Sequence, residues 1–161
     1  MNTFTVSFFG HRFIKNPCLI QVQLEKVIRN LLMSEEYVEF LVGRNGEFDL
    51  LVSSVVRKSK REIRNDNSAL VLVLPYTTAE FRDNEKNFLE YYDEIEICHE
   101  SSHVHFKAAH QIRNRIMVCR SDLIVFCVES NRGGAYQTMR YAEREKKKYI
   151  NLVCASQQEI W

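Results

Sequence analysis

Three short segments combine glycine with arginine or carboxylate side chains, and each follows an apolar stretch of the sequence. They are residues 10–12, 43–49 and 131–135. Glycine allows a tight turn and a close backbone approach, and the start of a helix offers unpaired N–H groups and the positive end of the helix dipole. Because these are the features that bind phosphate groups, we expect the three segments to form a site for a phosphate-bearing ligand.

The segment 43–49 reads Gly-Arg-Asn-Gly-Glu-Phe-Asp, and every residue in it except Phe48 is a candidate ligand contact. We expect its backbone to bind phosphate, together with Gly43, Arg44, Asn45 and Gly46. Glu47 and Asp49 would repel a bare phosphate, so they are candidates for ribose hydroxyls, for Mg²⁺ bound with a nucleotide, or for general acid/base catalysis. The alternative is an Asn-Gly turn with an acidic first helical turn and no ligand.

The other two segments add donors of the same kind. Asn131 to Ala135 holds consecutive glycines beside a guanidinium fork, with Arg132, Gly133, Gly134 and Ala135 as candidates. The first segment contributes Gly10, His11 and Arg12. A plain glycine turn is the alternative for each. The sequence has neither GxGxxG nor a glycine followed by Lys-Ser/Thr, so an NAD dehydrogenase and a P-loop NTPase lack support.

A predicted helix that precedes another apolar stretch carries Arg113, Asn114 and Arg115. Two residues that are two positions apart on a helix diverge by about 160°, so at most one of the arginines faces the site. We expect Asn114 to hydrogen-bond to a backbone loop. Arg113 and Asn114 join the candidate ligand contacts.

Histidines and cysteines give a weaker signal. His99, His103, His105 and His110 cluster near Cys98, but their spacing matches no zinc motif, so we expect a solvated or lid-like loop and no metal site. The five cysteines are scattered without a CxxC pair, which is typical of free thiols in a reducing compartment. Cys18, Cys98, Cys119, Cys127 and Cys154 are therefore expected to be unpaired.

Composition limits the class of protein. The 161 residues are 45% hydrophobic with 5 Gly and 2 Pro, which favours one globular domain over a disordered chain. The net charge of +1 does not favour a general polyanion partner such as duplex DNA or an acidic membrane, so any anion site must be local. No apolar run approaches the ~20 residues of a membrane span, and the first residues lack a secretory pattern. We expect a cytoplasmic protein.

Strand-like and helix-like stretches alternate along the chain. The predicted strands are residues 4–9, 37–42, 69–74, 94–98, 123–128 and 149–153, and helical spacing follows at residues 20–31, 48–63, 108–119 and 136–147. Residues 80–92 fit either a polar helix or an irregular lid. This alternation predicts an α/β fold, a Rossmann-like three-layer α/β/α sandwich with a mainly parallel sheet. In such sheets ligands lie at the carboxyl ends of the strands, where the three glycine segments meet.

Several of these motifs, in this order, resemble the SLOG superfamily, which contains the DprA/Smf proteins and the LOG phosphoribohydrolases, and within it the YpsA-like branch. The carriers are residues 8–12, 42–49, 74–76, 113–118, 120–122, 133–135 and 141–142. The resemblance covers nearly the whole chain, so we expect a single SLOG-like domain over residues 1–161. It implies a nucleotide pocket formed by the first, second and Gly-Gly segments.

The resemblance also separates the functional alternatives. Active LOG enzymes carry a catalytic glutamate after their glycine motif, and that position is Arg140 here, so the likeness does not extend to it. The leading hypothesis is binding of a nucleotide or an NAD- or ADP-ribose-like ligand as a sensor or regulator. A nucleotide hydrolase that uses Glu47 or Asp49 is the first alternative, and DprA-like binding of single-stranded DNA is the second. A homo-oligomer is expected because many Rossmann-like domains pair through helices.

Overall fold

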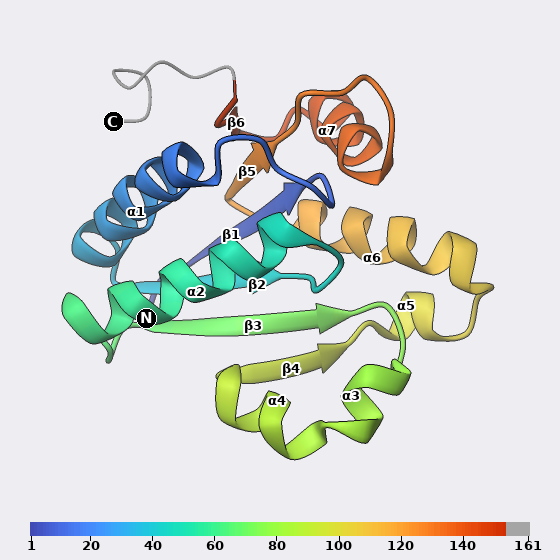
Figure 1. Ribbon diagram of the computed structural model, residues 1–161, viewed down its shortest axis with the longest axis horizontal. Helices are drawn as coiled ribbons and strands as arrows, with labels where there is room; N and C mark the ends of the chain where they lie inside the picture. Colours follow the sequence, from blue (N-terminus) through green and yellow to red (C-terminus); the bar gives the residue numbers. More distant parts are fainter. Residues whose placement is uncertain (154–161) are drawn as a thin grey trace.

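The computed structural model describes residues 1–153 and contains one parallel sheet covered by helices (Figure 1). The strands are β1 Thr3–Gly10, β2 Tyr37–Val42, β3 Ser68–Leu74, β4 Glu94–Ile97, β5 Leu123–Cys127 and β6 Tyr149–Asn151. The helices are α1 Pro17–Ser34, α2 Glu47–Glu62, α3 Ala79–Asp83, α4 Glu85–Tyr91, α5 His99–Ser102, α6 Phe106–Arg120 and α7 Gly134–Arg144. The predicted α/β class and mainly parallel sheet are confirmed.

The strand order is β4-β3-β2-β1-β5-β6, and every neighbouring pair is parallel. The chain runs outward from β1 to β4 and then returns to the other side of β1 with β5. The order therefore reverses between β1 and β5, where the loops that follow these two strands diverge to opposite faces of the sheet. Such a switch point leaves a crevice outside the carboxyl ends of the strands, which is where open α/β sheets bind ligands.

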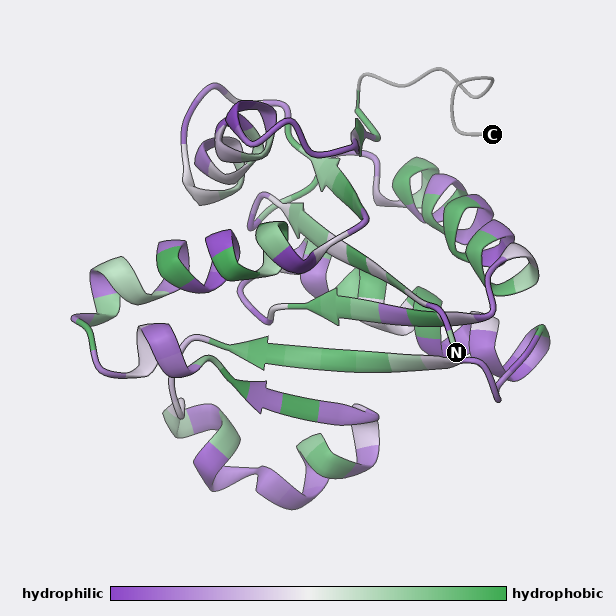
Figure 2. Ribbon diagram, turned by 180° about the vertical axis from the view of Figure 1, so that it is seen from behind, coloured by the Kyte–Doolittle hydropathy of each residue, from purple (hydrophilic) through white to green (hydrophobic). Residues whose placement is uncertain are grey.

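Two apolar layers hold the sheet between its helices. One side chain set of β1, Val6 and Phe8, packs with the buried faces of α1 and α2, and the alternate residue Phe9 packs with α6 and α7. In Figure 2 the central strands are mostly hydrophobic, as is typical of strands buried on both faces. β4 alternates between polar and apolar residues, as expected for an edge strand. The result is the predicted three-layer sandwich.

The segment that the sequence left open, residues 80–92, forms two short helices. Thr78 caps α3 by accepting a hydrogen bond from the Phe81 N–H at 3.1 Å, and α3 ends at Asp83. α4 follows at once and buries Phe88 against the α2 side of the sheet. This α3–α4 segment lies beside β4, at the lower edge of the view in Figure 1.

The structure also bears on the predicted absence of a membrane span and on the predicted free cysteines. No helix within residues 1–153 is long and apolar enough to cross a bilayer. Cys18 and Cys119 are exposed, Cys98 and Cys127 are buried, and all four are free thiols as expected. Cys154 lies outside the described residues.

Candidate functional site

A cavity of about 560 Å³ lies at the carboxyl edge of the sheet, at the switch point between β1 and β5. The loops after β1, β2 and β5 and the first half of α6 surround it. Its lining residues are Phe8, Phe9, Gly10, His11, Arg12, Gly43, Arg44, Asn45, Asp49, His110, Gln111, Arg113, Asn114, Gly133, Gly134 and Ala135. The three glycine segments, distant in the sequence, therefore meet at one site.

Hydrogen bonds from the first loop hold the other two loops in place. The Arg12 carbonyl accepts from the Glu47 N–H at 2.8 Å, at the first residue of α2. On the other side, His11 Nε2 accepts from the N–H groups of Glu129 and Ser130, each at 3.1 Å. The His11 side chain thus connects the loop after β1 to the loop after β5.

Two glycines are required by the geometry of these loops. A Cβ at Gly46 would lie 2.5 Å from the Arg12 Cα, so no side chain fits where the first two loops touch. Gly133 has φ +97°, a conformation that L residues rarely adopt, and no atom lies within 4 Å of where its Cβ would be. The backbone at Gly133 is therefore open, and this glycine lines the cavity.

Arg113 begins a chain of buried hydrogen bonds at the floor of the cavity. Its side chain is only 2% exposed, and its Nη1 donates to the Val73 carbonyl at 2.6 Å while its Nε donates to Asn114 Oδ1 at 2.9 Å. Asn114 Nδ2 donates to Thr138 Oγ1 at 3.0 Å, not to a loop backbone as the sequence predicted, and Thr138 in turn donates to the Gly134 carbonyl at 2.8 Å. The end of β3, α6 and the Gly-Gly loop are thus joined by one network.

Arg113 and Asp49 form the charged floor of the cavity. A Cβ at Gly43 would lie 3.3 Å from both Arg113 Nη2 and Asp49 Oδ2, so the two charged groups flank this glycine. Burial raises the pKa of Asp49, although the Asn45 N–H that donates to it at 2.8 Å and the nearby Arg113 lower it. Burial lowers the pKa of Arg113, and Asp49 opposes that change. An arginine stays protonated even so, and the floor carries a desolvated guanidinium.

Sequence reasoning missed four residues of the lining. His110 Nδ1 lies 3.3 Å from Asn45 Nδ2. Burial, and to a smaller extent the nearby charge of Arg113, lowers the pKa of His110, which favours a neutral ring. Gln111 Nε2 donates to the Gly134 carbonyl at 3.4 Å. Phe8 and Phe9 complete the set. Spacing could have indicated His110 and Gln111, because each lies three positions before a predicted contact, Arg113 or Asn114, and residues three apart are neighbours on one helix face.

Three predicted contacts lie outside the cavity lining. Gly46 packs on the Arg12 backbone, and Glu47 Oε2 accepts from the Ile14 N–H at 2.9 Å. The exposed Arg132 makes no side-chain hydrogen bond or ion pair within residues 1–153. Arg113 and Arg115 diverge as predicted, and the Arg115 guanidinium lies over the Tyr141 ring at 5.1 Å.

Arg12 and Arg44 differ in how their charge is used. Arg12 is exposed at the mouth of the cavity, without a side-chain partner in the described part of the chain. Arg44 Nε donates to Glu80 at 2.9 Å and its Nη1 donates to the Tyr92 hydroxyl at 3.0 Å. Burial alone lowers the pKa of Arg44, but these two partners raise it above its ordinary value. Arg12 and Arg113 therefore hold the uncommitted positive charge.

The carboxylates do not fit the magnesium site considered for Glu47 and Asp49. Glu47 is committed to the first loop outside the cavity lining, and Asp49 lies beside the Arg113 guanidinium. A cation would need converging oxygen ligands, and Arg113 repels it. Of the two carboxylates considered for catalysis, only Asp49 borders the cavity.

The histidine segment was predicted as a loop, but His99 lies on α5 and His110 on α6, and its four rings have three different environments. The rings of His99 and His103 contact each other at 5.3 Å, His105 lies on Phe106, and His110 contacts Tyr76. Within the described residues, the one group of three potential metal ligands is Glu39, Glu94 and Glu96. Arg120 already forms ion pairs with Glu39 and Glu96 at 3.0 and 2.6 Å.

Comparison with known solved structures shows the fold of the chain. No protein-family model and no curated protein sequence matches the chain. Among solved structures, DNA processing protein A (DprA) from Streptococcus pneumoniae matches 91% of this chain and 49% of its own, with 14% identity and a TM-score of 0.63. DprA from Helicobacter pylori, in a study of its single-stranded DNA binding mode, matches 91% of this chain and 63% of its own, with 15% identity and a TM-score of 0.65. The chain thus spans about half to two thirds of these proteins and shares their fold.

Proposed function

We propose that this chain binds single-stranded nucleic acid, with a backbone phosphate in the cavity at the carboxyl edge of the sheet. The observation that carries the proposal is the Arg113 guanidinium, which is almost fully buried yet borders the cavity. Its Nε and Nη1 are committed, whereas its Nη2 has no acceptor among the described residues. Nη2 is not among the fully buried side-chain atoms that lack a partner within the described residues, so it is open to the cavity, where an anionic oxygen is its natural partner.

The surroundings of Arg113 support an anion of this kind. Arg12 adds a second unpaired guanidinium at the mouth, and the Gly133 backbone leaves room for a close approach. The lining holds three arginines against Asp49 alone, so it is more positive than a chain of net charge +1 suggests. Phosphate contacts of this sort supply most of the sequence-independent affinity for a strand.

The shared fold supports the choice of a strand as the source of that phosphate. The Helicobacter pylori protein binds single-stranded DNA, and it shares its fold with 91% of the present chain. DprA-like binding was the second alternative that the sequence suggested. The SLOG resemblance is compatible with it, since that superfamily includes the DprA/Smf proteins.

A free nucleotide is the second candidate, and the size of the cavity favours it. A volume of about 560 Å³ lies within the range of roughly 300–1,000 Å³ that small-molecule sites occupy. The same donors would hold the phosphate of a nucleotide or of an ADP-ribose-like ligand. If such a ligand were also hydrolysed, Asp49 is the carboxyl group in reach.

Fluorescence anisotropy with a labelled thymidine oligonucleotide of about 16 nucleotides tests the proposal. We expect binding that weakens with added salt, and we expect Arg12→Ala to lower the affinity about fivefold and reduce the salt slope by about one. Arg61→Ala is the matched control, because Arg61 is exposed near the far end of α2, roughly 20 Å along that helix from the cavity. Its affinity should equal that of the parent protein.

Competition separates the two candidates. Thymidine monophosphate and ADP-ribose are added as unlabelled competitors, and nucleotide products are followed by chromatography. Displacement by a monomer at the same concentration as the strand would favour the free nucleotide. Absence of strand binding at low salt would refute the proposal.

A further inference from the structure

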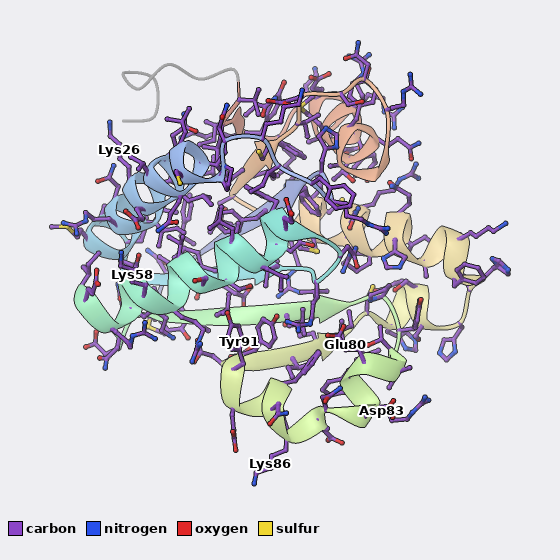
Figure 3. The ribbon with its side chains drawn as sticks, viewed as in Figure 1. Lys26, Lys58, Glu80, Asp83, Lys86 and Tyr91 are labelled. Atoms are coloured by element: carbon purple, nitrogen blue, oxygen red, sulfur yellow. The ribbon has the colours of Figure 1, made fainter. Side chains whose placement is uncertain are left out.

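A second cavity adjoins the first and is lined by aromatic rings. It has a volume of about 440 Å³ and lies between α2 and the α3–α4 segment, where Glu80 and Tyr91 are labelled in Figure 3. Its lining residues are Arg44, Leu50, Glu80, Asn84, Asn87, Phe88, Tyr91 and Tyr92. We call this set the aromatic slot.

The rings of the slot form one packed cluster. Tyr91 and Tyr92 have centroids 4.9 Å apart, and Phe88 lies 6.0 Å from Tyr92 and 5.6 Å from Phe81. Three of these four side chains come from α4 and its C-terminal end. Phe88 and Tyr92 belong to the buried core on the α2 side of the sheet, so the partly exposed ring of the slot is that of Tyr91.

Arg44 is the wall between the slot and the first cavity, since it lines both. Its guanidinium carbon lies 4.7 Å from the centroid of Phe88, over the ring face. The same side chain donates to Glu80 and to the Tyr92 hydroxyl. A planar cation therefore occupies an aromatic face in the slot. A second planar cation, Arg57, is not part of the slot lining and lies over one face of the Tyr91 ring, 4.0 Å from its centroid.

We propose that the aromatic slot holds one base of a bound single strand, stacked against Tyr91 and the guanidinium of Arg44. This inference rests on the proposed function and names a second subsite for the same ligand. A base is flat and has a π face, so it stacks on aromatic rings and on arginine planes. The sharing of Arg44 means that a phosphate in the first cavity and a base in the slot lie on opposite sides of one side chain.

The polar residues of the slot fit the edge of a base. Asn87 is exposed beside Phe88 and makes no side-chain hydrogen bond with any described residue. An amide offers both a donor and an acceptor, which matches the polar edges of nucleobases. Asn84 is less available, because its Nδ2 already donates to the Glu80 carbonyl at 2.9 Å. The slot thus combines a stacking surface with one free amide.

Two oligonucleotides with the same number of phosphates test this inference. One is the thymidine strand used above, and the other is an abasic deoxyribose-phosphate strand of equal length. We expect the parent protein to bind the thymidine strand about tenfold more tightly, since stacking of one base on an aromatic side chain is worth about that factor.

Variants of the slot assign the difference to these residues. Tyr91→Leu keeps an apolar side chain at a partly exposed position, and we expect it to weaken thymidine binding about tenfold while leaving abasic binding unchanged. Asn87→Ala should act in the same direction with a smaller loss. Leu89→Ala is the control, because Leu89 is 58% exposed on α4 and does not line the slot, and both strands should bind it as they bind the parent.

The outcomes distinguish the slot from the first cavity. Equal affinity for the two strands, or an equal loss of both in Tyr91→Leu, would overturn the slot and leave the proposed function standing. If neither strand binds, the proposed function fails and the slot fails with it. Thermal unfolding of each variant in the absence of DNA shows that the fold is intact.

Discussion

Replacement of Arg113 by methionine is the most direct test of the buried network. Arg113→Met removes two hydrogen bonds from a charged donor, to the Val73 carbonyl at 2.6 Å and to Asn114 Oδ1 at 2.9 Å. Each such bond is worth about 1.5–3 kcal/mol, so the expected loss in the free energy of unfolding is roughly 3–6 kcal/mol. A similar range, about 3–5 kcal/mol, applies when a buried charge loses its opposite neighbour, as Asp49 would lose the nearby Arg113.

The loss should depend on pH through Asp49. Burial raises the pKa of this carboxyl group, so between its ordinary and raised pKa the folded protein binds more protons than the unfolded chain. The free energy of unfolding therefore falls as the pH rises through that window. Without Arg113 the pKa of Asp49 rises further, because Arg113 is one of the groups that lower it. Arg113→Met should thus lose more stability near about pH 8 than near about pH 5.

Urea denaturation at several pH values measures both effects. The exposed Arg115 provides the control, and Arg115→Met should change the free energy of unfolding by no more than about 0.5 kcal/mol. Asp49→Asn in the Arg113→Met background should recover about 1–2 kcal/mol at neutral pH, because it removes the unpaired buried charge. A loss below about 1 kcal/mol, or a loss that does not change with pH, would refute the network as described.

Two further predictions concern the loops and the thiols. Gly46→Ala should lower the melting temperature more than Gly133→Ala does. A Cβ at Gly46 would meet the Arg12 backbone at 2.5 Å, whereas a Cβ at Gly133 has open space and adds only the strain of a φ of +97°. Equal melting temperatures would contradict this geometry. Burial raises the pKa of Cys127 to about 12, so iodoacetamide followed by peptide mass spectrometry should label the exposed Cys119 in the native protein and Cys127 only after unfolding. Labelling of both at one rate would show that Cys127 is not buried.

The sheet was predictable from the sequence because buried strands consist almost entirely of apolar residues. β3 and β5 are nearly continuous apolar runs, which is the pattern of a strand that is covered by helices on both faces and has no side facing water. The α3–α4 segment was less predictable, since only Phe88 and its neighbouring rings pack inward and the rest of the segment is polar. A helix that buries one residue leaves little periodicity to detect.

The meeting of the three loops also followed from the sequence, whereas the partners of individual side chains did not. Parallel strands end at one edge, so the loops after β1, β2 and β5 had to lie together. The sequence did not indicate that the Glu47 carboxylate, in the first turn of α2, accepts a hydrogen bond from the Ile14 N–H of the neighbouring loop. Which of several arginines keeps its charge for a ligand depends on contacts across the fold.

Net charge is a poor guide to anion binding when a fold separates its charges. The acids Glu39 and Glu96 neutralise Arg120 at the C-terminal end of α6, about 10 Å along the helix from Arg113. Glu80 similarly engages Arg44, while Arg12 and Arg113 keep free donors at the cavity. The net charge of +1 sums over acids and bases that lie far from the site, so it does not report the positive charge at the cavity. A strand that binds here should respond to the few unpaired arginines, which is why a single substitution at Arg12 is expected to change the salt dependence measurably.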